Sequence, residues 1–228
     1  GEFFVGDERL DARTNSGIRT LLQGAIACND AKLEERNDGA TNGWNIIGDP
    51  TEGALVVAAA KCGLQQQEVA RAAPRLQEIP FDSERKRMTT IHRNDGLVAL
   101  RSGQLAGDAD GLIAFVKGAP DVVVELCTHV LDGGAPIELK HALRATILEQ
   151  NHEMASQALR VLAVACRPLE RMPAELSPKV VERDLVFIGL LGIIDPPRPE
   201  VIDAIRVAKG AGLRTVMVTG DYKDTAEA

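Results

Sequence analysis

The pattern of apolar residues changes at Asp184, and this change constrains the fold more than any other feature of the chain. An apolar run covers residues 185–194, a helical pattern follows over residues 199–209, and a second apolar run covers residues 213–218. Two such strands joined by a helix are typical of a βαβ unit, whose right-handed crossover connects parallel strands. The residues before Asp184 instead predict helices mixed with short, half-polar strands. We therefore expect an α+β domain followed by the beginning of an α/β domain.

Composition and charge exclude several classes of protein. The chain has 228 residues, of which 45% are apolar and 26% charged, so one large domain with a sizeable core and an appendage is expected. The net charge of −7 argues against nucleic acid or an anionic membrane as the main partner, because both require a basic face. No apolar run approaches the ~20 residues of a membrane helix. We expect the chain itself to be soluble and cytosolic.

The cysteines lie far apart and without paired spacing, at positions 28, 62, 127 and 166. This spacing favours buried thiols in a reducing compartment over a zinc site or disulfides. The four histidines are equally scattered. We therefore predict no metal site in this chain.

Capping signals and apolar periodicity predict four helices in the first part of the chain. An apolar stripe indicates the first helix, over residues 18–26. Asp49 as N-cap and Pro50 at the first helical position mark the start of the second helix, which ends at Gly63. Between these two helices we expect a polar loop over residues 29–45. The other two helices are expected over residues 120–126 and 139–154.

Strands are predicted where apolar and polar residues partly alternate, over residues 76–81, 88–93, 112–117 and 159–167. The polar segment 102–111 and the prolines at positions 168, 173 and 178 indicate loops. In the C-terminal part, Asp195 and Asp221 fall at the ends of the two apolar runs. Ligands of α/β sheets collect at this edge.

The first candidate site motif is Gly-Asp-Pro-Thr-Glu-Gly over residues 48–53. Glu52 stands three residues after the N-cap, where its carboxylate can close a capping box with the helix start. The same carboxylate can instead accept a hydrogen bond from an adenine amino group. The local sequence leaves both alternatives open.

The second motif is Phe-Asp-Ser-Glu-Arg-Lys over residues 81–86, a polar turn after a predicted strand. Its aromatic residue, Phe81, is either a core residue or a platform on which a base stacks. A polar turn after a strand usually leaves its aromatic residue in the core. The neighbouring Arg85 and Lys86 nevertheless suit the second alternative, because a flat ring stacks on a base and cations neutralise phosphates.

The third motif is Lys-Gly-Ala-Pro over residues 117–120, where a predicted strand ends and a helix begins. Gly118 either serves a tight turn or lets a ligand approach the backbone closely. In the second case Lys117 points a mobile ammonium group at the ligand.

The fourth motif is Leu-Arg-Val-Leu over residues 159–162, in which Arg160 and Leu162 share one strand face. A cation beside an apolar side chain suits a half-open pocket, and it suits a solvent-facing edge equally well.

Taken together and in this order, these motifs resemble the P-type ATPases, and most closely the type II group that includes the calcium pumps. The resemblance spans residues 3–228. Its most specific elements are Lys-Gly-Ala-Pro, Asp-Pro-Pro-Arg at 195–198 and Thr-Gly-Asp at 219–221. It implies a nucleotide-binding domain over residues 1–191, with an antiparallel sheet flanked by helices. It also implies a fragment of a haloacid dehalogenase-like phosphorylation domain over residues 192–228.

The resemblance also implies roles for individual residues. Phe81 would stack on adenine, Glu52 would contact its amino edge, and Arg160 would reach the phosphates. The residues implied to line the nucleotide site are Thr51, Glu52, Phe81, Ser83, Arg85, Lys86, Lys117, Gly118, Arg160 and Leu162. Those implied at the hinge and the transferred phosphate are Asp195, Thr219, Gly220 and Asp221.

The family context implies partners that lie outside this chain. ATP or ADP would bind here, with Mg²⁺ accompanying ATP in the full-length pump. The chain would work with the remaining phosphorylation, actuator and membrane domains, as a cytoplasmic domain of an integral membrane protein. Calcium is the transported ion that the style of the motifs suggests.

The sequence departs from the family pattern in two respects. The phosphorylated aspartate of the family, in an Asp-Lys-Thr-Gly-Thr motif, is absent, so we predict ATP binding without turnover and no catalytic residue in this chain. Calcium pumps often have an arginine where this chain has Ser83, and Arg85 would partly compensate. The C-terminal segment would be either disordered or paired in a dimer, since most strands of its sheet are missing.

Two other functions fit parts of the sequence. A free-standing haloacid dehalogenase-like phosphohydrolase needs an Asp-x-Asp pair after a buried strand. Here the Asp-x-Asp pair, residues 108–110, follows a polar loop. The other rival is a nucleotide-free interaction module with a vestigial pocket, against which the retained Phe81, Lys86, Lys117 and Arg160 argue.

Overall fold

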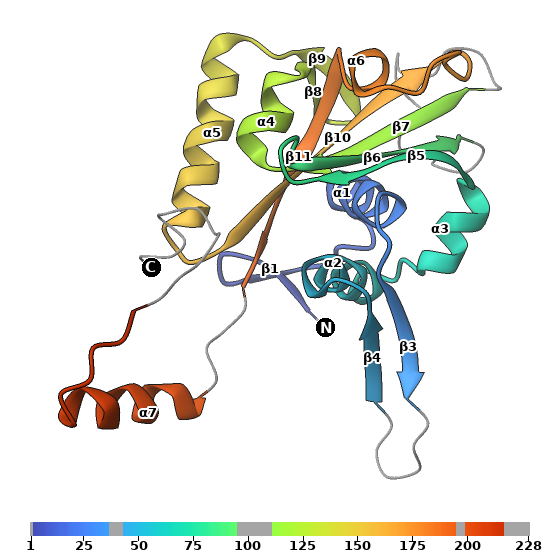
Figure 1. The fold of residues 1–228 in the computed structure, drawn as a ribbon. Coiled ribbons are helices and arrows are strands. Elements are labelled where there is room, and N and C mark those ends of the chain that lie inside the picture. The colour runs from blue at the N-terminus through green and yellow to red at the C-terminus, as the bar shows by residue number, and fades with distance from the viewer. Residues whose placement is uncertain (1, 37–42, 95–110, 195–198, 217–228) are drawn as a thin grey trace.

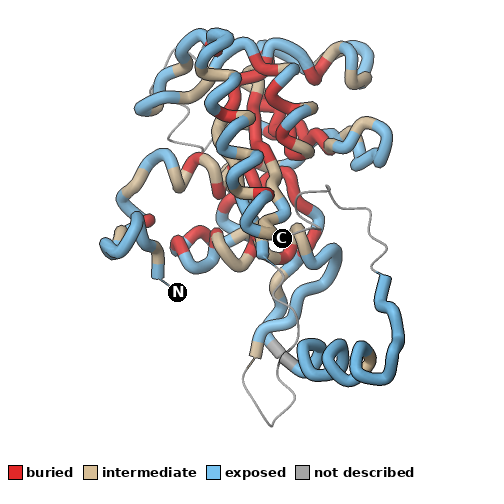
Figure 2. The backbone as a smooth tube through the Cα atoms, turned by 90° about the vertical axis from the view of Figure 1, so that its left-hand side faces the viewer, coloured by how far each residue is buried: buried red, intermediate tan, exposed pale blue. Residues whose placement is uncertain are grey.

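The computed structural model of the protein describes residues 2–36, 43–94, 111–194 and 199–216. Within these residues a seven-stranded sheet lies between two groups of helices (Figure 1). One face is covered by α1 (Ser16–Ala27), α2 (Pro50–Lys61) and α3 (Gln66–Ala72). The other face is covered by α4 (Pro120–Glu125), α5 (His141–Ala155) and α6 (Pro178–Val181). Figure 2 shows the buried residues concentrated between the two helical layers.

The order of the strands in the sheet is β5 (Arg75–Asp82), β6 (Arg87–Arg93), β7 (Leu112–Gly118), β10 (Arg160–Leu169), β11 (Leu185–Ile193), β8 (Cys127–Asp132) and β9 (Ala135–Glu138). Among these strands β11 and β8 are parallel and the other neighbours are antiparallel. The predicted antiparallel sheet is therefore a mixed sheet, flanked by helices as expected for an α+β domain.

Alternation along the central strand β7 divides the core into two faces. Ile113 and Phe115 pack against the side of α1 and α3, whereas Ala114 and Val116 face the side of α4 and α6. Because β7 has helices on both faces, its sequence is almost continuously apolar. This arrangement leaves Lys117 as the exception in an apolar strand.

Local sequence signals were most successful at the start of α2. Asp49 caps the helix as predicted, because its side chain accepts hydrogen bonds from the amides of Thr51 and Glu52. Pro50 occupies the first helical position, and Gly63 follows the helix with a φ of +76°. That left-handed conformation suits glycine, which has no Cβ.

Two hairpins lie in segments where the sequence predicted no strand. The predicted loop 29–45 contains β3 (Lys32–Arg36) and β4 (Gly43–Ile47), and the segment before α5 contains β8 and β9. A third hairpin, β1 (Phe3–Val5) with β2 (Glu8–Leu10), precedes α1. Most of these strands are short and largely exposed, so they lack the alternation of apolar residues that marks a half-buried strand.

Pro168 lies inside β10 and not in the predicted loop. It pairs with Ile113 of β7. On the other side of β10 the pairing with β11 extends only to Cys166. A proline without an N–H group is tolerated where the strand has one partner.

The prediction that the apolar run 185–194 is the first strand of a separate βαβ unit is wrong. β11 pairs with β10 and β8, so it belongs to the sheet of the first domain. The predicted helix is present as α7 (Pro199–Gly210), but residues 213–216 form no strand and are exposed. Residues 217 and 218 lie outside the described part. The domain boundary at 191/192 and the haloacid dehalogenase-like fragment stay predictions.

The four cysteines are free and buried, which confirms the prediction of unpaired thiols. Burial raises the pKa of both Cys127 and Cys166 to about 12, so these thiols are protonated at neutral pH. Among the described residues no helix is long and apolar enough to cross a membrane.

Candidate functional site

Segments that carry predicted site residues meet at one end of the seven-stranded sheet. The start of β6 lies beside the end of β7, where Met88 pairs with Lys117. The start of β10 lies on the other side of β7, where Val164 pairs with Lys117. The turn over residues 83–86 adjoins the same end, because it leads directly into β6. The register thus brings the turn, Lys117 and the region of Arg160 to one edge.

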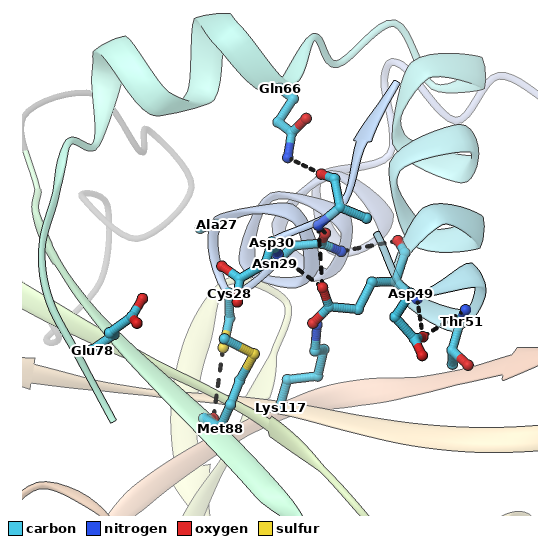
Figure 3. A network of polar contacts seen from close by, with 12 residues as sticks. Ala27, Cys28, Asn29, Asp30, Asp49, Thr51, Gln66, Glu78, Met88 and Lys117 are labelled. Carbon is cyan, nitrogen blue, oxygen red and sulfur yellow. Dashed lines mark hydrogen bonds and ion pairs between the residues drawn. The ribbon is translucent and has the colours of Figure 1, made fainter. Parts of the chain in front are cut away.

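Lys117 and Glu52 form the central contact of this site. Lys117 lies on the face of β7 that packs against α1, and its Nζ is 2.7 Å from Glu52 Oε1 (Figure 3). The two side chains are only 6% and 17% exposed. Each charge is therefore neutralised by the other in a largely desolvated place. Without nucleotide, burial and the ion pair hold the Lys117 ammonium group, so its predicted mobility toward a ligand stays a prediction.

The carboxylate of Glu52 does not close a capping box. Its Oε2 accepts hydrogen bonds from the backbone amides of Asp30 (2.9 Å) and Ala31 (3.2 Å). The helix start is capped by Asp49 instead. Burial opposes ionisation of Asp49, but hydrogen bonds from the first-turn amides outweigh it, so the pKa lies below its ordinary value. The two carboxylates therefore have separate tasks.

The turn that holds Glu52 is supported by side chains outside the four sequence motifs. Asn29 donates from Nδ2 to the Glu52 carbonyl (3.0 Å) and accepts the Ala31 amide at Oδ1 (2.9 Å). Arg75 in β5 donates to the Asn29 carbonyl and to the Asp30 carboxylate, both at 2.6 Å. One sequence signal could have identified this turn. Asn29 and Asp30 directly follow the first helical pattern, and asparagine is common just after the end of a helix.

Arg160 reaches the first turn of α2 from the start of β10. Its Nη1 lies 3.2 Å from Thr51 Oγ1. Leu162 points to the same face and packs against the apolar cluster between α1 and α2. The structure thus brings Thr51, Arg160 and Leu162 together with Glu52 and Lys117.

The end of β5 presents the predicted aromatic residue to solvent. Phe81 is 64% exposed, which excludes the alternative that it is a core residue. Asp82 shapes the turn, because its carboxylate accepts the Arg85 amide (2.8 Å) and its carbonyl accepts the Lys86 amide (2.7 Å). Ser83 and Lys86 are exposed. Within the described residues, no hydrogen bond or ion pair joins their side chains to those at the start of α2.

Gly118 is required by the packing of β6 on β7. A Cβ at this position would collide with the Lys86 carbonyl oxygen and lie 2.8 Å from the Arg87 Cα. The amide of Ala119 also donates to the Lys86 carbonyl (3.0 Å). The tight approach of backbone to backbone accounts for this glycine, and it fixes the β5–β6 turn beside Lys117.

Arg85 does not join the residues around α2. Its Nη1 lies 2.6 Å from Glu182 Oε1, on the side of the sheet that α6 covers. Lys117 and Arg160 lie on the opposite side, with α1 and α2. Glu182 was not predicted from the sequence, because it follows Arg85 by 97 positions and no local pattern links the two.

The predicted hinge and phosphate residues Asp195, Thr219, Gly220 and Asp221 lie outside the described residues, as does the Asp-x-Asp pair at 108–110. The strand that leads toward them is described. β11 ends with Ile193 paired to Arg160, so the chain leaves the sheet at the same end as the site. Within the described ranges, no three His, Cys, Asp or Glu side chains are arranged to hold a metal ion.

Comparison with known proteins identifies relatives over the whole chain. Residues 17–200 match the family model described as P-type ATPase, cytoplasmic domain N. The chain is 38% identical over 223 residues to calcium-transporting ATPase 1 of Lactococcus lactis, covering 98% of this chain and 23% of that protein. It is 37% identical over 234 residues to cation-transporting ATPase pma1 of Synechocystis, covering 100% of this chain and 23% of that protein. The chain therefore spans about a quarter of the length of these relatives.

Proposed function

The chain belongs to the P-type ATPases, whose cytoplasmic domain N it matches, and from this premise we propose that it binds ATP at the site formed by α2 and the end of the sheet. The observation that carries the proposal is the pair of cations at one helix start. Lys117 contacts Glu52 at 2.7 Å and Arg160 contacts Thr51 at 3.2 Å, each from a different strand. An exposed phenyl group, that of Phe81, lies near the end of β5, next to the turn that leads into β6.

Aromatic, acidic, apolar and basic side chains match different parts of the nucleotide. A flat phenyl ring stacks on adenine, and the 64% exposure of Phe81 leaves a face for it. Glu52 accepts a hydrogen bond from the adenine amino group, and Leu162 packs against the nucleotide. Lys86, Lys117 and Arg160 neutralise the phosphates. Thr51, Ser83 and Gly118 shape the surroundings, and Arg85 acts from the other side of the turn.

Binding requires a rearrangement of the ion pair. Glu52 Oε1 and Lys117 Nζ are paired with each other. One of the two groups must therefore change its partner when the nucleotide binds. Glu52 stays held through Oε2 by the amides of Asp30 and Ala31. We therefore assign the movement to the Lys117 side chain, whose flexible stem permits it.

In the full-length protein this domain grips adenosine and delivers the γ-phosphate to an aspartate that is not in this chain. The chemistry depends mainly on positioning and charge neutralisation. The exit of the chain at the site end, after Ile193, supports this delivery. Asp195, Thr219, Gly220 and Asp221 would face the hinge and the phosphate. Magnesium would supply further charge neutralisation with ATP, and the described residues form no separate site for it.

The whole protein is proposed to hydrolyse ATP and to transport a cation, with calcium as the first candidate. This chain would be its cytoplasmic nucleotide-binding part and would contact the remaining phosphorylation, actuator and membrane domains. The names of the relatives from Lactococcus lactis and Synechocystis, which refer to calcium and cation transport, support the proposal.

One observation favours a nucleotide-free interaction module instead, because Glu52 and Lys117 already satisfy each other. Calorimetric titration of the 228-residue chain with ATP and with ADP separates the two functions. We expect a Kd of roughly 0.1–1 mM for both nucleotides, or about −4 to −5.5 kcal/mol, since adenosine supplies most of the contacts. No heat with either nucleotide, or a preference for ATP above about a hundredfold, contradicts the proposal.

A further inference from the structure

Glu182 is a buried carboxylate that the proposed nucleotide site does not include. Its side chain is 0% exposed. Oε1 accepts hydrogen bonds from Arg85 Nη1 (2.6 Å) and Thr89 Oγ1 (2.7 Å), and Oε2 accepts one from Arg87 Nε (2.6 Å). Three donors from the β5–β6 turn and β6 thus converge on one acceptor group. A buried carboxylate with this many charged partners specifies the geometry of those partners.

The segment that carries Glu182 is fixed independently of the turn. Val181 is fully buried and packs with Ile91 and Ala114 on this face of the sheet. Arg167 in β10 donates to the carbonyl of Val180 (2.7 Å). Because these contacts anchor the end of α6, Glu182 is a rigid reference point for the more exposed turn.

Arg85 connects the Glu182 carboxylate to the backbone next to Phe81. Its planar guanidinium binds Glu182 through Nη1 and the carbonyl oxygen of Pro80 through Nη2, both at 2.6 Å. The Pro80 carbonyl and the Phe81 amide belong to the same planar peptide unit. Holding the oxygen therefore fixes the orientation of the backbone from which the Phe81 side chain extends.

We infer that Glu182 is a positioning residue of the nucleotide site, and this inference rests on the proposed binding of ATP. It holds Arg85 against the Pro80 carbonyl and thereby sets the place where the exposed Phe81 ring meets the base. Arg85 accordingly serves the site through the backbone of the turn and not through contact with phosphate.

The test compares two variants of the 228-residue chain that break the link at different points. Glu182→Gln removes the charge that holds Arg85. Arg85→Lys keeps a cation but loses the fork that binds two oxygens. Each is expected to raise the Kd for ATP about tenfold, the lower part of what a base–aromatic stack contributes. The double variant is expected to bind no more weakly than either single variant, since both break one link.

A spectroscopic readout separates positioning from general loss of stability. In nucleotide-free protein, the Phe81 amide resonance is expected to shift or broaden in both variants. The matched control is Ile147→Ala, which truncates a buried side chain of α5 in a different apolar cluster from that of Val181 and leaves the three hydrogen-bond donors of Glu182 in place. It is expected to unfold at lower denaturant, with an unchanged Kd for ATP and an unchanged Phe81 amide.

Several results overturn the inference. Folded Glu182→Gln that binds ATP like the wild type, or more tightly because Arg85 is released toward phosphate, contradicts it. If Glu182→Gln does not fold, Arg85→Lys decides, and an unchanged Phe81 amide with unchanged affinity is the contrary outcome. If the wild-type chain itself fails to bind ATP, the proposed function is overturned. If the wild type binds ATP and the variants bind it equally well, only the role of Glu182 is overturned.

Discussion

Lys117 at the end of β7 and Glu52 in the first turn of α2 lie 65 positions apart and form an ion pair of 2.7 Å. The pair joins the sheet to the helical layer at the proposed nucleotide site. Since Glu52 also accepts two amides of the α1–β3 turn, it connects three segments of the chain. The pair therefore has a structural task in the absence of nucleotide.

Removal of the cation is expected to destabilise the fold. Lys117→Met leaves the Glu52 carboxylate without its charged partner and should lower the free energy of unfolding by about 3 kcal/mol, the lower end of the cost of breaking a buried pair. The double variant with Glu52→Gln should recover part of this loss. Urea denaturation measures both. Equal stability of Lys117→Met and the wild type would show that the pair contributes nothing to the fold.

Phe81 and Phe115 provide a matched comparison between an exposed and a buried ring. Phe81→Ala should lower ATP affinity by about 1–3 kcal/mol, as loss of a base–aromatic stack does, with little effect on unfolding. Phe115 is fully buried, so Phe115→Ala should lower the free energy of unfolding by about 3–5 kcal/mol. Calorimetry and urea denaturation separate the effects. Unchanged ATP binding by Phe81→Ala counts against the stacking role.

His92 makes the stability of the fold depend on pH. Burial lowers the pKa of His92 from 6.5 to about 4. The neutral ring donates from Nδ1 to the Ala73 carbonyl (2.8 Å), while Nε2 pairs with the Thr90 hydroxyl. Between pH 6.5 and 4, His92 is protonated in the unfolded chain and stays neutral in the native protein. The stability from the neutral ring is thus present above pH 6.5 and lost as the pH falls toward 4.

This loss amounts to about 3 kcal/mol if the whole pKa difference is realised. Denaturation of wild type and of His92→Gln across this pH range isolates the contribution, because the other titrating groups are common to both. The difference between their free energies of unfolding should shrink as the pH falls. A constant difference would show that His92 does not titrate as described.

The C-terminal segment is expected to associate. Val201, Ile202 and Ile205 are exposed on α7, and Leu213 and Val216 are exposed beyond it. Burial of such apolar side chains favours a dimer. Light scattering should find a dimer for the full chain and a monomer for a version that ends at Ile194. A monomer in both cases would contradict the predicted pairing.

The sequence predicted the elements whose signals are local. The start of α2 was identified because Asp49 and Pro50 act within one helical turn, and β6 and β7 because their apolar pattern is pronounced. The βαβ unit was mispredicted for a physical reason. The apolar run of β11 reflects its place between β10 and β8, under helices on both faces, and this pattern is the same in a buried antiparallel strand.

Some predicted members of the candidate site lie together in the structure, but the contacts that hold them were not predicted. The motifs identified Glu52, Lys117 and Arg160, but the support from Arg75 and Glu182 depends on contacts across 45 to 97 positions. Periodicity carries no information on such distant pairs. Glu52 was ambiguous for a related reason, because a capping box and a contact with an adenine amino group require the same residue type at the same helical position, and its ion pair with Lys117 was not predicted.

The most direct test of the account is a titration of the ¹⁵N-labelled chain with ATP, followed through its amide resonances. We predict that the largest shift changes cluster at residues 51–53, 81–86, 117–118 and 160–162, and that the β8–β9 hairpin, far along the sheet, changes little. The ATP-induced changes should also be weaker in Phe81→Ala. Saturating ATP that leaves these four segments unperturbed, or that shifts the β8–β9 hairpin instead, would contradict the assignment of the nucleotide site.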